Sequence, residues 1–130
     1  MGIVSATRRR VQHVLVIDDD PAVRQLVCDV LTAYGYTTTS AVDGYAGLRA
    51  LSATRPDAVV LDVMMPGLDG HEVLARIRDS EGGSALPVVM LTAAADDDHA
   101  WRAWNGGVDY FLAKPFEPED LLTFLAEATS

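Results

Sequence analysis

The 130-residue sequence predicts an α/β fold, a single doubly wound domain made of five strand–helix units. Short apolar segments rich in β-branched residues alternate with segments of helical periodicity, and no internal repeat interrupts them. A strand followed by a helix forms a crossover connection, so we expect parallel strands with helices on both faces of the sheet. Hydrophobic residues make up 49% and charged residues 22% of the chain. This balance is typical of one globular domain with one core.

The first two units cover the first half of the chain. The strand "HVLVID" ends at Asp18, and a helix is expected to begin at Asp20, a capping residue, and Pro21. Apolar residues then recur at helical spacing, at Val23, Leu26, Val27, Val30, Leu31 and Tyr34. The β-branched strand "YTTTSA" and a short helix over "DGYAGLRALSATR" form the second unit, which ends at the Pro56 turn.

The remaining three units follow the same order. The strand "DAVVLD" ends at Asp62, and the loop "VMMPGLDG" leads to a helix that carries Val73, Leu74 and Ile77. The strand "LPVVMLT" precedes a helix over about 96–105. The strand "VDYFLA" precedes the last helix, over about 118–128.

Composition excludes several classes of function. A formal net charge of -9 disfavours direct binding to nucleic acid and to anionic membranes. The apolar run "LPVVML" is far shorter than the roughly 20 residues of a membrane-spanning helix. Residues 1–10 carry their charges after the weakly apolar part, the reverse of a secretory signal, so we expect a flexible leader before a domain over residues 11–130 and a cytoplasmic location. Cys28 is the only cysteine, which excludes an internal disulfide.

Polar side chains follow the predicted strands at one edge of the sheet. Asp18 and Asp19 end the first strand, Asp62 the third and Thr92 the fourth, while Lys114 follows the fifth. Ligands of open parallel sheets bind beyond the carboxyl ends of the strands, so these side chains are expected to share one cleft. Three carboxylates are too few to surround Ca²⁺ fully, and they suit Mg²⁺ that keeps several waters.

A bound cation also explains why three aspartates stand together at residues 18–20. Two carboxylates about 5 Å apart repel by roughly 3 kcal/mol at an effective dielectric near 20. Mg²⁺ would neutralise this repulsion and assist the in-line transfer of a phosphoryl group to one carboxylate. We expect Asp62 to be that acceptor and to be open to attack. Thr92 and Lys114 would bind the other phosphoryl oxygens.

These residues and motifs resemble the response regulator receiver domain of two-component and phosphorelay signalling. The resemblance covers about residues 11 to 128, and its motifs occur in the family's order and spacing: "VLVIDDDP", "AVVLDVMMPGLDG", "PVVMLTA" and "VDYFLAKPF". It implies a chemotaxis-regulator-like sheet of order 2-1-3-4-5. It also implies phosphorylation of Asp62 by a histidine kinase or phosphotransfer protein. Asp19, Asp62 and the Met64 carbonyl would bind Mg²⁺ directly, and Asp18 mainly through water.

The resemblance also implies a conformational switch. Thr92 and Lys114 would sense the phosphoryl group, the peptide bond between Lys114 and Pro115 would be cis, and Phe111 would turn inward when Thr92 moves. Tyr110 competes for the switch role if the strand register is shifted by one. In relatives, the residues two positions after the acceptor and the threonine influence hydrolysis of the acyl phosphate. Here they are Met64 and Ala94, which cannot position a water, so we expect slow self-dephosphorylation.

Other functions remain open on the sequence alone. Asp18 and Asp20 form the Asp-x-Asp pair of a haloacid-dehalogenase-like phosphatase, although its usual following threonine is missing. A receiver used only as a protein-binding module is the stronger alternative. The three aspartates in isolation also suit a solvated turn with a helix cap.

Partners are predicted only by class. We expect a kinase or phosphotransfer protein and an unknown effector that binds the face of the fourth and fifth helices, with the protein a monomer or weak dimer. The sequence ends just after the last helix, so we expect either a stand-alone or an excised receiver. The fifth-helix segment "EPEDLLTFLAEATS" has no basic residue, which disfavours one type of DNA-binding dimer. Trp101 and Trp104 are expected to divide between core and surface. His13, His71 and His99 lack metal-ligand spacing and are expected to be structural.

Overall fold

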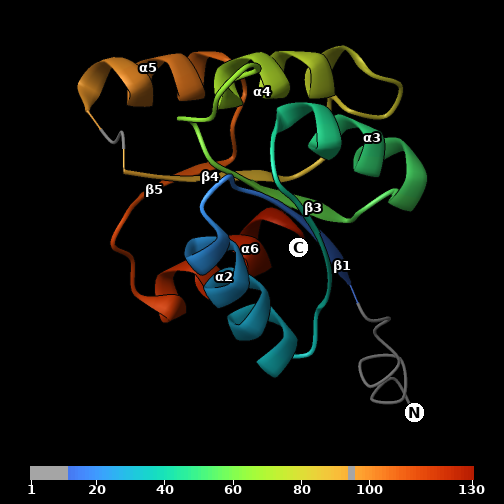
Figure 1. Cartoon of the computed structure of the whole chain (residues 1–130), viewed down its shortest axis with the longest axis vertical. Helices are drawn as coiled ribbons and strands as arrows, with labels where there is room; N and C mark the ends of the chain where they lie inside the picture. The colour runs from blue at the N-terminus through green and yellow to red at the C-terminus, as the bar shows by residue number, and fades with distance from the viewer. Residues whose placement is uncertain (1–11, 94–95) are drawn as a thin grey trace.

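The chain folds into a five-stranded parallel sheet between two layers of helices (Figure 1). The computed structural model describes residues 12–93 and 96–130, so the expected leader over residues 1–10 lies outside them. The strands are β1 (His13–Ile17), β2 (Thr37–Ala41), β3 (Ala58–Leu61), β4 (Val88–Thr92) and β5 (Tyr110–Ala113). The helices are α2 (Pro21–Ala33), α3 (Gly44–Thr54), α4 (Gly70–Asp79), α5 (Asp97–Asn105) and α6 (Pro118–Ala128). The observed strand order, β2-β1-β3-β4-β5, confirms the predicted fold.

Alternating strand residues build a separate core on each face of the sheet. In β1, Leu15 and Ile17 pack with residues of α3, α4 and α5, whereas Val14 and Val16 pack with residues of α2 and α6. The same alternation holds in β3, β4 and β5, because successive side chains of a strand point to opposite faces. Central strands covered on both sides read as continuous apolar runs. This is why "AVVL" and "VVMLT" are buried at every position.

Aspartate caps bring four helices to the carboxyl edge of the sheet. The side chains of Asp20, Asp43, Asp69 and Asp96 accept hydrogen bonds from the first backbone N–H groups of α2, α3, α4 and α5. Asp69 and Glu72 form a reciprocal capping box at the start of α4. As a result, the loops that carry polar side chains at this edge are each followed by a firmly started helix.

Gly70 allows α4 to begin directly against the end of β3. Its N–H donates to the Val63 carbonyl at 2.8 Å. A Cβ atom at this position would lie 2.1 Å from the Asp62 carbonyl oxygen, well inside van der Waals contact. Only glycine therefore fits this approach, which fixes the path of the chain that follows Asp62.

The rotation of α5 corrects one expectation. Ala103 is the buried residue of this helix, so the side that carries Ala103 faces the sheet. Trp101 and Trp104 are 66% and 52% exposed, so neither belongs to the core. The prediction that one tryptophan would be buried is therefore wrong.

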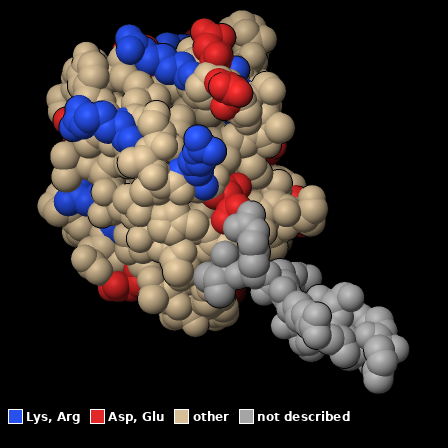
Figure 2. Space-filling view, turned by 90° about the vertical axis from the view of Figure 1, so that its right-hand side faces the viewer, with Lys and Arg blue, Asp and Glu red and all other residues tan. Residues whose placement is uncertain are grey.

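Charge is distributed unevenly over the molecule. Figure 2 shows Lys and Arg groups gathered on the side nearest to α3 and β1, with few Asp and Glu groups between them. Arg49 lies in α3 and Arg55 directly follows that helix. Arg76 and Arg78 lie in the last turn of α4. In contrast, α6 carries Glu119, Asp120 and Glu127 and no basic residue. The acidic helix α6 thus differs in charge from α3 and the last turn of α4, which carry these arginines.

Candidate functional site

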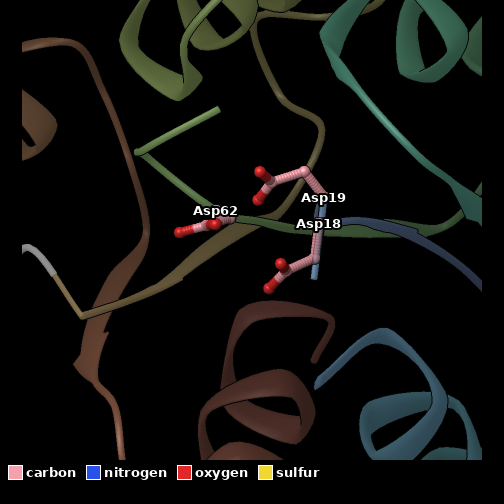
Figure 3. Close-up of side chains that lie close together, drawn as sticks. All are labelled: Asp18, Asp19 and Asp62. Atoms are coloured by element: carbon pink, nitrogen blue, oxygen red, sulfur yellow. The ribbon is translucent and has the colours of Figure 1, made fainter. Parts of the chain in front are cut away.

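Three carboxylates meet beyond the carboxyl ends of β1 and β3. Carboxylate oxygens of Asp18, Asp19 and Asp62 all lie within 4.8 Å of one another. Figure 3 shows the three side chains pointing toward the same space. Asp18 and Asp62 are buried, with 3% and 5% exposure, and Asp19 is exposed. The predicted cluster is thus present, with its open side at Asp19.

Asp20 has a different task from its two neighbours. Its carboxylate accepts hydrogen bonds from the N–H groups of Ala22 at 2.9 Å and Val23 at 3.4 Å, and so caps α2. Its own N–H donates to Asp18 at 2.9 Å. The predicted capping role is confirmed, and only the first two aspartates of the triplet contribute to the cluster.

Lys114 places a cation against the two buried carboxylates. Its Nζ lies 2.8 Å from Asp18 Oδ2 and 3.6 Å from Asp62 Oδ2. The N–H of Lys114 donates to the carbonyl of Thr92, which places it beside the end of β4. The peptide bond between Lys114 and Pro115 is cis. The lysine therefore joins the edge of β5 to the acidic cluster, and its ammonium is oriented by Asp18.

Hydrogen bonds hold the Asp62 carboxylate in place. Oδ1 accepts from the N–H of Val63 at 2.8 Å, and the carboxylate also accepts from the Thr92 hydroxyl. Burial raises the pKa of Asp62, and the negative charge of Asp18 raises it further. Lys114 and the two hydrogen bonds oppose this rise but do not cancel it. An anionic Asp62 is therefore costly, and added positive charge would stabilise it.

The structure differs from the expectation that Asp62 is open to attack. Only 6% of its side chain is exposed, because Lys114, Asp18 and Thr92 crowd around it. Its carboxylate still faces the cluster and Lys114 rather than the apolar core. The longer of the two lysine contacts, 3.6 Å, is to Asp62. A reactant can therefore reach Asp62 only if the ammonium of Lys114 moves away from it. Lys114 can make this movement while it keeps its shorter contact with Asp18.

The donor set fits Mg²⁺ on chemical grounds. Mg²⁺ binds hard oxygen ligands and is usually held by one or two carboxylates together with waters and phosphate oxygens. Two buried carboxylates and one exposed carboxylate within 4.8 Å supply such ligands. Met64, whose carbonyl the resemblance adds to the set, lies in the loop after Asp62 and has a 60% exposed side chain. A divalent cation would also relieve the repulsion that raises the pKa of Asp62.

The two adjacent aromatic residues of β5 lie on opposite faces of the sheet. Phe111 is half-buried against the core under α3, α4 and α5 and is paired in register with Met90. Tyr110 packs on the other face, where its ring stacks on Phe124 with centres 4.6 Å apart, and its hydroxyl donates to Glu127. Phe111 thus lies on the α5 side, as the switch prediction requires, and Tyr110 does not. Ala94 lies outside the described residues.

Sequence reasoning missed one pairing near this edge. His71, in the first turn of α4, and His99, in the first turn of α5, make a contact of 3.0 Å between ring nitrogens. They are 28 positions apart, so no spacing rule predicts the contact. The only available signal was that each follows a capping aspartate by two or three residues.

Comparison with known proteins gives the family of the chain's relatives. The sequence profile of the response regulator receiver domain matches residues 14–126. The response regulator MprA of Mycobacterium ulcerans is 44% identical over 110 residues, which cover 85% of this chain and 47% of that protein. The DNA-binding dual master transcriptional regulator RpaA of Synechocystis is 39% identical over 110 residues, covering 85% of this chain and 46% of that protein. The chain therefore spans about half the length of these curated relatives.

Solved structures agree with the sequence comparison. The chemotaxis protein CheY4 of Vibrio cholerae superposes with a TM-score of 0.86 and 31% identity, over 92% of this chain and 99% of that one. The alignment thus takes in nearly all of a chemotaxis receiver. None of the helices within residues 12–93 and 96–130 combines the length and hydropathy needed to cross a bilayer.

Proposed function

Because the chain belongs to the response regulator receiver domain family, whose members are phosphorylated on aspartate in two-component signalling, we propose that Asp62 is the phosphoacceptor. A histidine kinase or a histidine phosphotransfer protein would be the donor, and the reaction would require Mg²⁺. The single observation that carries this proposal is the position of Lys114, 2.8 Å from Asp18 and 3.6 Å from Asp62. A cation beside two buried carboxylates is what a site for an incoming phosphoryl group needs.

Each polar residue of the site has a part in the transfer. An oxygen of Asp62 attacks phosphorus while the bond from phosphorus to the donor's histidine nitrogen breaks, and the electron pair of that bond stays with the imidazole. Lys114 moves from Asp62 to a phosphoryl oxygen and keeps Asp18 as its partner. The Thr92 hydroxyl, which donates to Asp62 in the unmodified protein, donates to another phosphoryl oxygen.

Asp19, Asp62 and the Met64 carbonyl would hold Mg²⁺ directly, with Asp18 acting mainly through water. Bound there, Mg²⁺ supplies charge neutralisation between Asp62 and the incoming phosphoryl oxygens. Support comes from the carboxylate oxygens that lie within 4.8 Å of one another. The exposed Asp19 gives the cation a route from solvent.

The signalling step follows from Thr92. When Thr92 turns toward the phosphoryl group, it leaves space on the α5 side of β5, and Phe111 turns into that space. Shifting a two-state equilibrium from 1:99 to 99:1 requires a preference of roughly 5.5 kcal/mol. Hydrogen bonds to a charged group contribute about 1.5–3 kcal/mol each. Hydrogen bonds from Thr92 and Lys114 to the phosphoryl group can therefore supply a free energy of this order.

An effector would read this change on the surface formed by α5, β5 and α6, which are the predicted fourth helix, fifth strand and fifth helix. The acidic character of α6 and the net charge of -9 disfavour direct contact with nucleic acid by this domain. We place the receiver at residues 11–130, in the cytoplasm, as a monomer or weak dimer, acting alone or within a longer regulator.

Slow self-dephosphorylation is part of the proposal. Met64 offers only a thioether near the acceptor, and Ala94 offers no polar side chain, so neither orients a water for hydrolysis. The aspartyl phosphate should therefore outlast mixing and analysis on a scale of minutes. A half-life of seconds in the presence of Mg²⁺ would contradict this part.

Incubation with acetyl phosphate and Mg²⁺ separates the three candidate functions. Intact mass spectrometry should show one added phosphoryl group that is retained by the protein. Rapid release of phosphate from p-nitrophenyl phosphate, without a retained group, would instead indicate a phosphatase. An unmodified mass would indicate a module that only binds proteins, and either result would overturn the proposal.

A further inference from the structure

His71 and His99 join the first turns of two neighbouring helices. His71 lies in α4 just after its capping residue Asp69, and His99 lies in α5 after its capping residue Asp96. Nε2 of His71 lies 3.0 Å from Nδ1 of His99. The two residues belong neither to the acidic cluster nor to the phosphoryl-binding set. The contact therefore calls for a separate explanation.

The ring geometry shows that the two imidazoles meet end to end. Their planes differ by only 5°, and their centres are 5.2 Å apart, much farther than the 3.0 Å between the nitrogens. Both nitrogens must then lie close to the line that joins the ring centres. One nitrogen donates its N–H and the other accepts with its lone pair. A Zn²⁺ ion on this line would need about 2 Å to each nitrogen, so only a proton fits between them.

The pair holds this arrangement only while one facing nitrogen is free of a proton. If both rings were doubly protonated, two N–H groups would point at each other and two positive charges would meet. Both imidazoles also lie at helix amino ends, where the helix dipole disfavours added positive charge. A second proton must therefore break the contact.

The surroundings of His71 favour its neutral form. Burial lowers the pKa of His71, and the positive charges of Arg102 and His99 lower it further, whereas Asp69 and Asp98 act in the opposite direction. Among the described residues, Nδ1 of His71 is buried and has no hydrogen-bond partner. Protonation at Nδ1 would bury an unpaired N–H that carries charge.

The contact between His71 and His99 joins α4 to the amino end of α5, whereas other contacts join α4 to the carboxyl end of α5. At the carboxyl end of α5, Leu74 packs against Gly106, and Arg78 donates to the carbonyl of Gly107 at 2.6 Å. Arg78 also holds the loop before β4 through the carbonyls of Gly83 and Leu86. The imidazole contact lies at the opposite end, where α5 follows the loop that starts after Thr92.

We propose that His71 and His99 form a proton-controlled clasp, which holds the amino end of α5 against α4 when one proton lies between the imidazoles and opens when both rings are protonated. Opening leaves the carboxyl end of α5 anchored by Arg78 and frees its amino end. The effect on signalling rests on the proposed function, because α5 begins a few residues after Thr92 in the chain and forms part of the effector surface. Proton-dependent opening itself does not rest on it.

Trp101 and Trp104 report directly on the clasp. They are the two tryptophans of the chain, and both lie in α5. Intrinsic fluorescence of the unphosphorylated protein, without Mg²⁺, should change between about pH 8 and about pH 5. The midpoint should lie below 6.5, the ordinary histidine pKa. Because opening requires both rings to be protonated, the ratio of open to closed forms should change at least about tenfold per pH unit.

Two variants at one position test the cause of this change. His71→Gln offers an amide to His99 and does not titrate, so the fluorescence transition should disappear and the signal should stay at its pH 8 level. His71→Ala removes the contact, so its signal at pH 8 should match that of the unsubstituted protein at pH 5. His13→Gln is the matched control, since the His13 ring contacts Thr37 and Thr39 in β2. It should leave the midpoint unchanged.

Two results would overturn the clasp. One is a flat fluorescence signal across the pH range in the unsubstituted protein. The other is an unaltered transition in His71→Gln, which would assign the change to quenching by His99 alone. Because the protein in these titrations carries no phosphoryl group, a failure here leaves the assignment of Asp62 intact. Conversely, a failure of Asp62 to accept phosphate leaves the clasp intact.

Discussion

The ammonium group of Lys114 lies 2.8 Å from a carboxylate oxygen of Asp18, although 96 positions separate the two residues in the chain. Asp18 follows β1 and Lys114 follows β5, and β3 and β4 lie between these strands. The ion pair therefore spans the carboxyl edge of the sheet above Asp62. It stabilises the lysine where a phosphoryl group would arrive and gives it a partner to keep when it leaves Asp62.

Replacing Lys114 with methionine should slow phosphorylation of the protein. The substitution keeps an unbranched apolar stem and removes the charge that would bind a phosphoryl oxygen. Losing one donor of this kind reduces a rate by on the order of 100-fold. A mass-spectrometric time course with acetyl phosphate and Mg²⁺ measures the change. Phosphorylation at the unsubstituted rate would show that Lys114 has no part in the transfer.

The free energy of unfolding should depend on pH through Asp62. Burial and Asp18 raise the pKa of Asp62 above 3.8 in the folded protein, so the folded state keeps this proton at pH values where the unfolded chain has lost it. The contribution of Asp62 to stability is therefore full below 3.8 and is lost as pH rises through the folded-state pKa.

Asp62→Asn removes this charge without changing the shape of the side chain. In buffer without Mg²⁺ it should raise the free energy of unfolding at pH 7, because the folded protein no longer carries a charge that burial and Asp18 disfavour. The gain should shrink toward low pH, where Asp62 is protonated in both states. Urea denaturation at a series of pH values measures it. If Asp62→Asn were less stable than the unsubstituted protein at pH 7, the charge of Asp62 would not be disfavoured by burial and by Asp18.

Mg²⁺ should stabilise the folded protein through the acidic cluster. A ligand present at 100 times its Kd and bound only by the folded state adds about 2.7 kcal/mol to the free energy of unfolding. Thermal unfolding with and without Mg²⁺ detects this gain. Asp19→Asn should reduce the gain strongly, whereas Asp79→Asn, an exposed residue at the end of α4, should retain it. Equal gains in both variants would place the cation elsewhere.

Phe111 and Tyr110 should differ in their effect on signalling. Phe111→Ala removes a ring from the α5 side of the sheet, so the response of Trp101 and Trp104 fluorescence to phosphorylation should be lost. Tyr110→Phe removes only the hydroxyl that donates to Glu127 on the other face of the sheet. It should keep the response. If the fluorescence response were lost in Tyr110→Phe and kept in Phe111→Ala, Tyr110 rather than Phe111 would be the switch residue.

The elements of this fold follow from local patterns that require no knowledge of the tertiary structure. Continuous apolar runs predicted the central strands β3 and β4, and Asp20 with Pro21 predicted the start of α2. The common edge of the parallel strands then predicted that Asp18, Asp62 and Lys114 would meet. In the structure these residues, which are far apart in the sequence, are in contact.

Features that depend on helix rotation and side-chain crowding could not be predicted in this way. Trp101 and Trp104 are both exposed because Ala103 sets which side of α5 faces the sheet. The contact between His71 and His99 depends on how α4 and α5 are placed relative to each other. The low exposure of Asp62 results from neighbours contributed by three other strands, which no single motif encodes.

The central claim is that the carboxylate of Asp62 accepts the phosphoryl group. Its most direct test is the intact mass of the unsubstituted protein and of Asp62→Asn after exposure to acetyl phosphate and Mg²⁺. We predict one added phosphoryl group on the unsubstituted protein, none on Asp62→Asn, and none on either protein when a chelator removes the Mg²⁺. Equal modification of Asp62→Asn, or no modification of the unsubstituted protein, would contradict the claim.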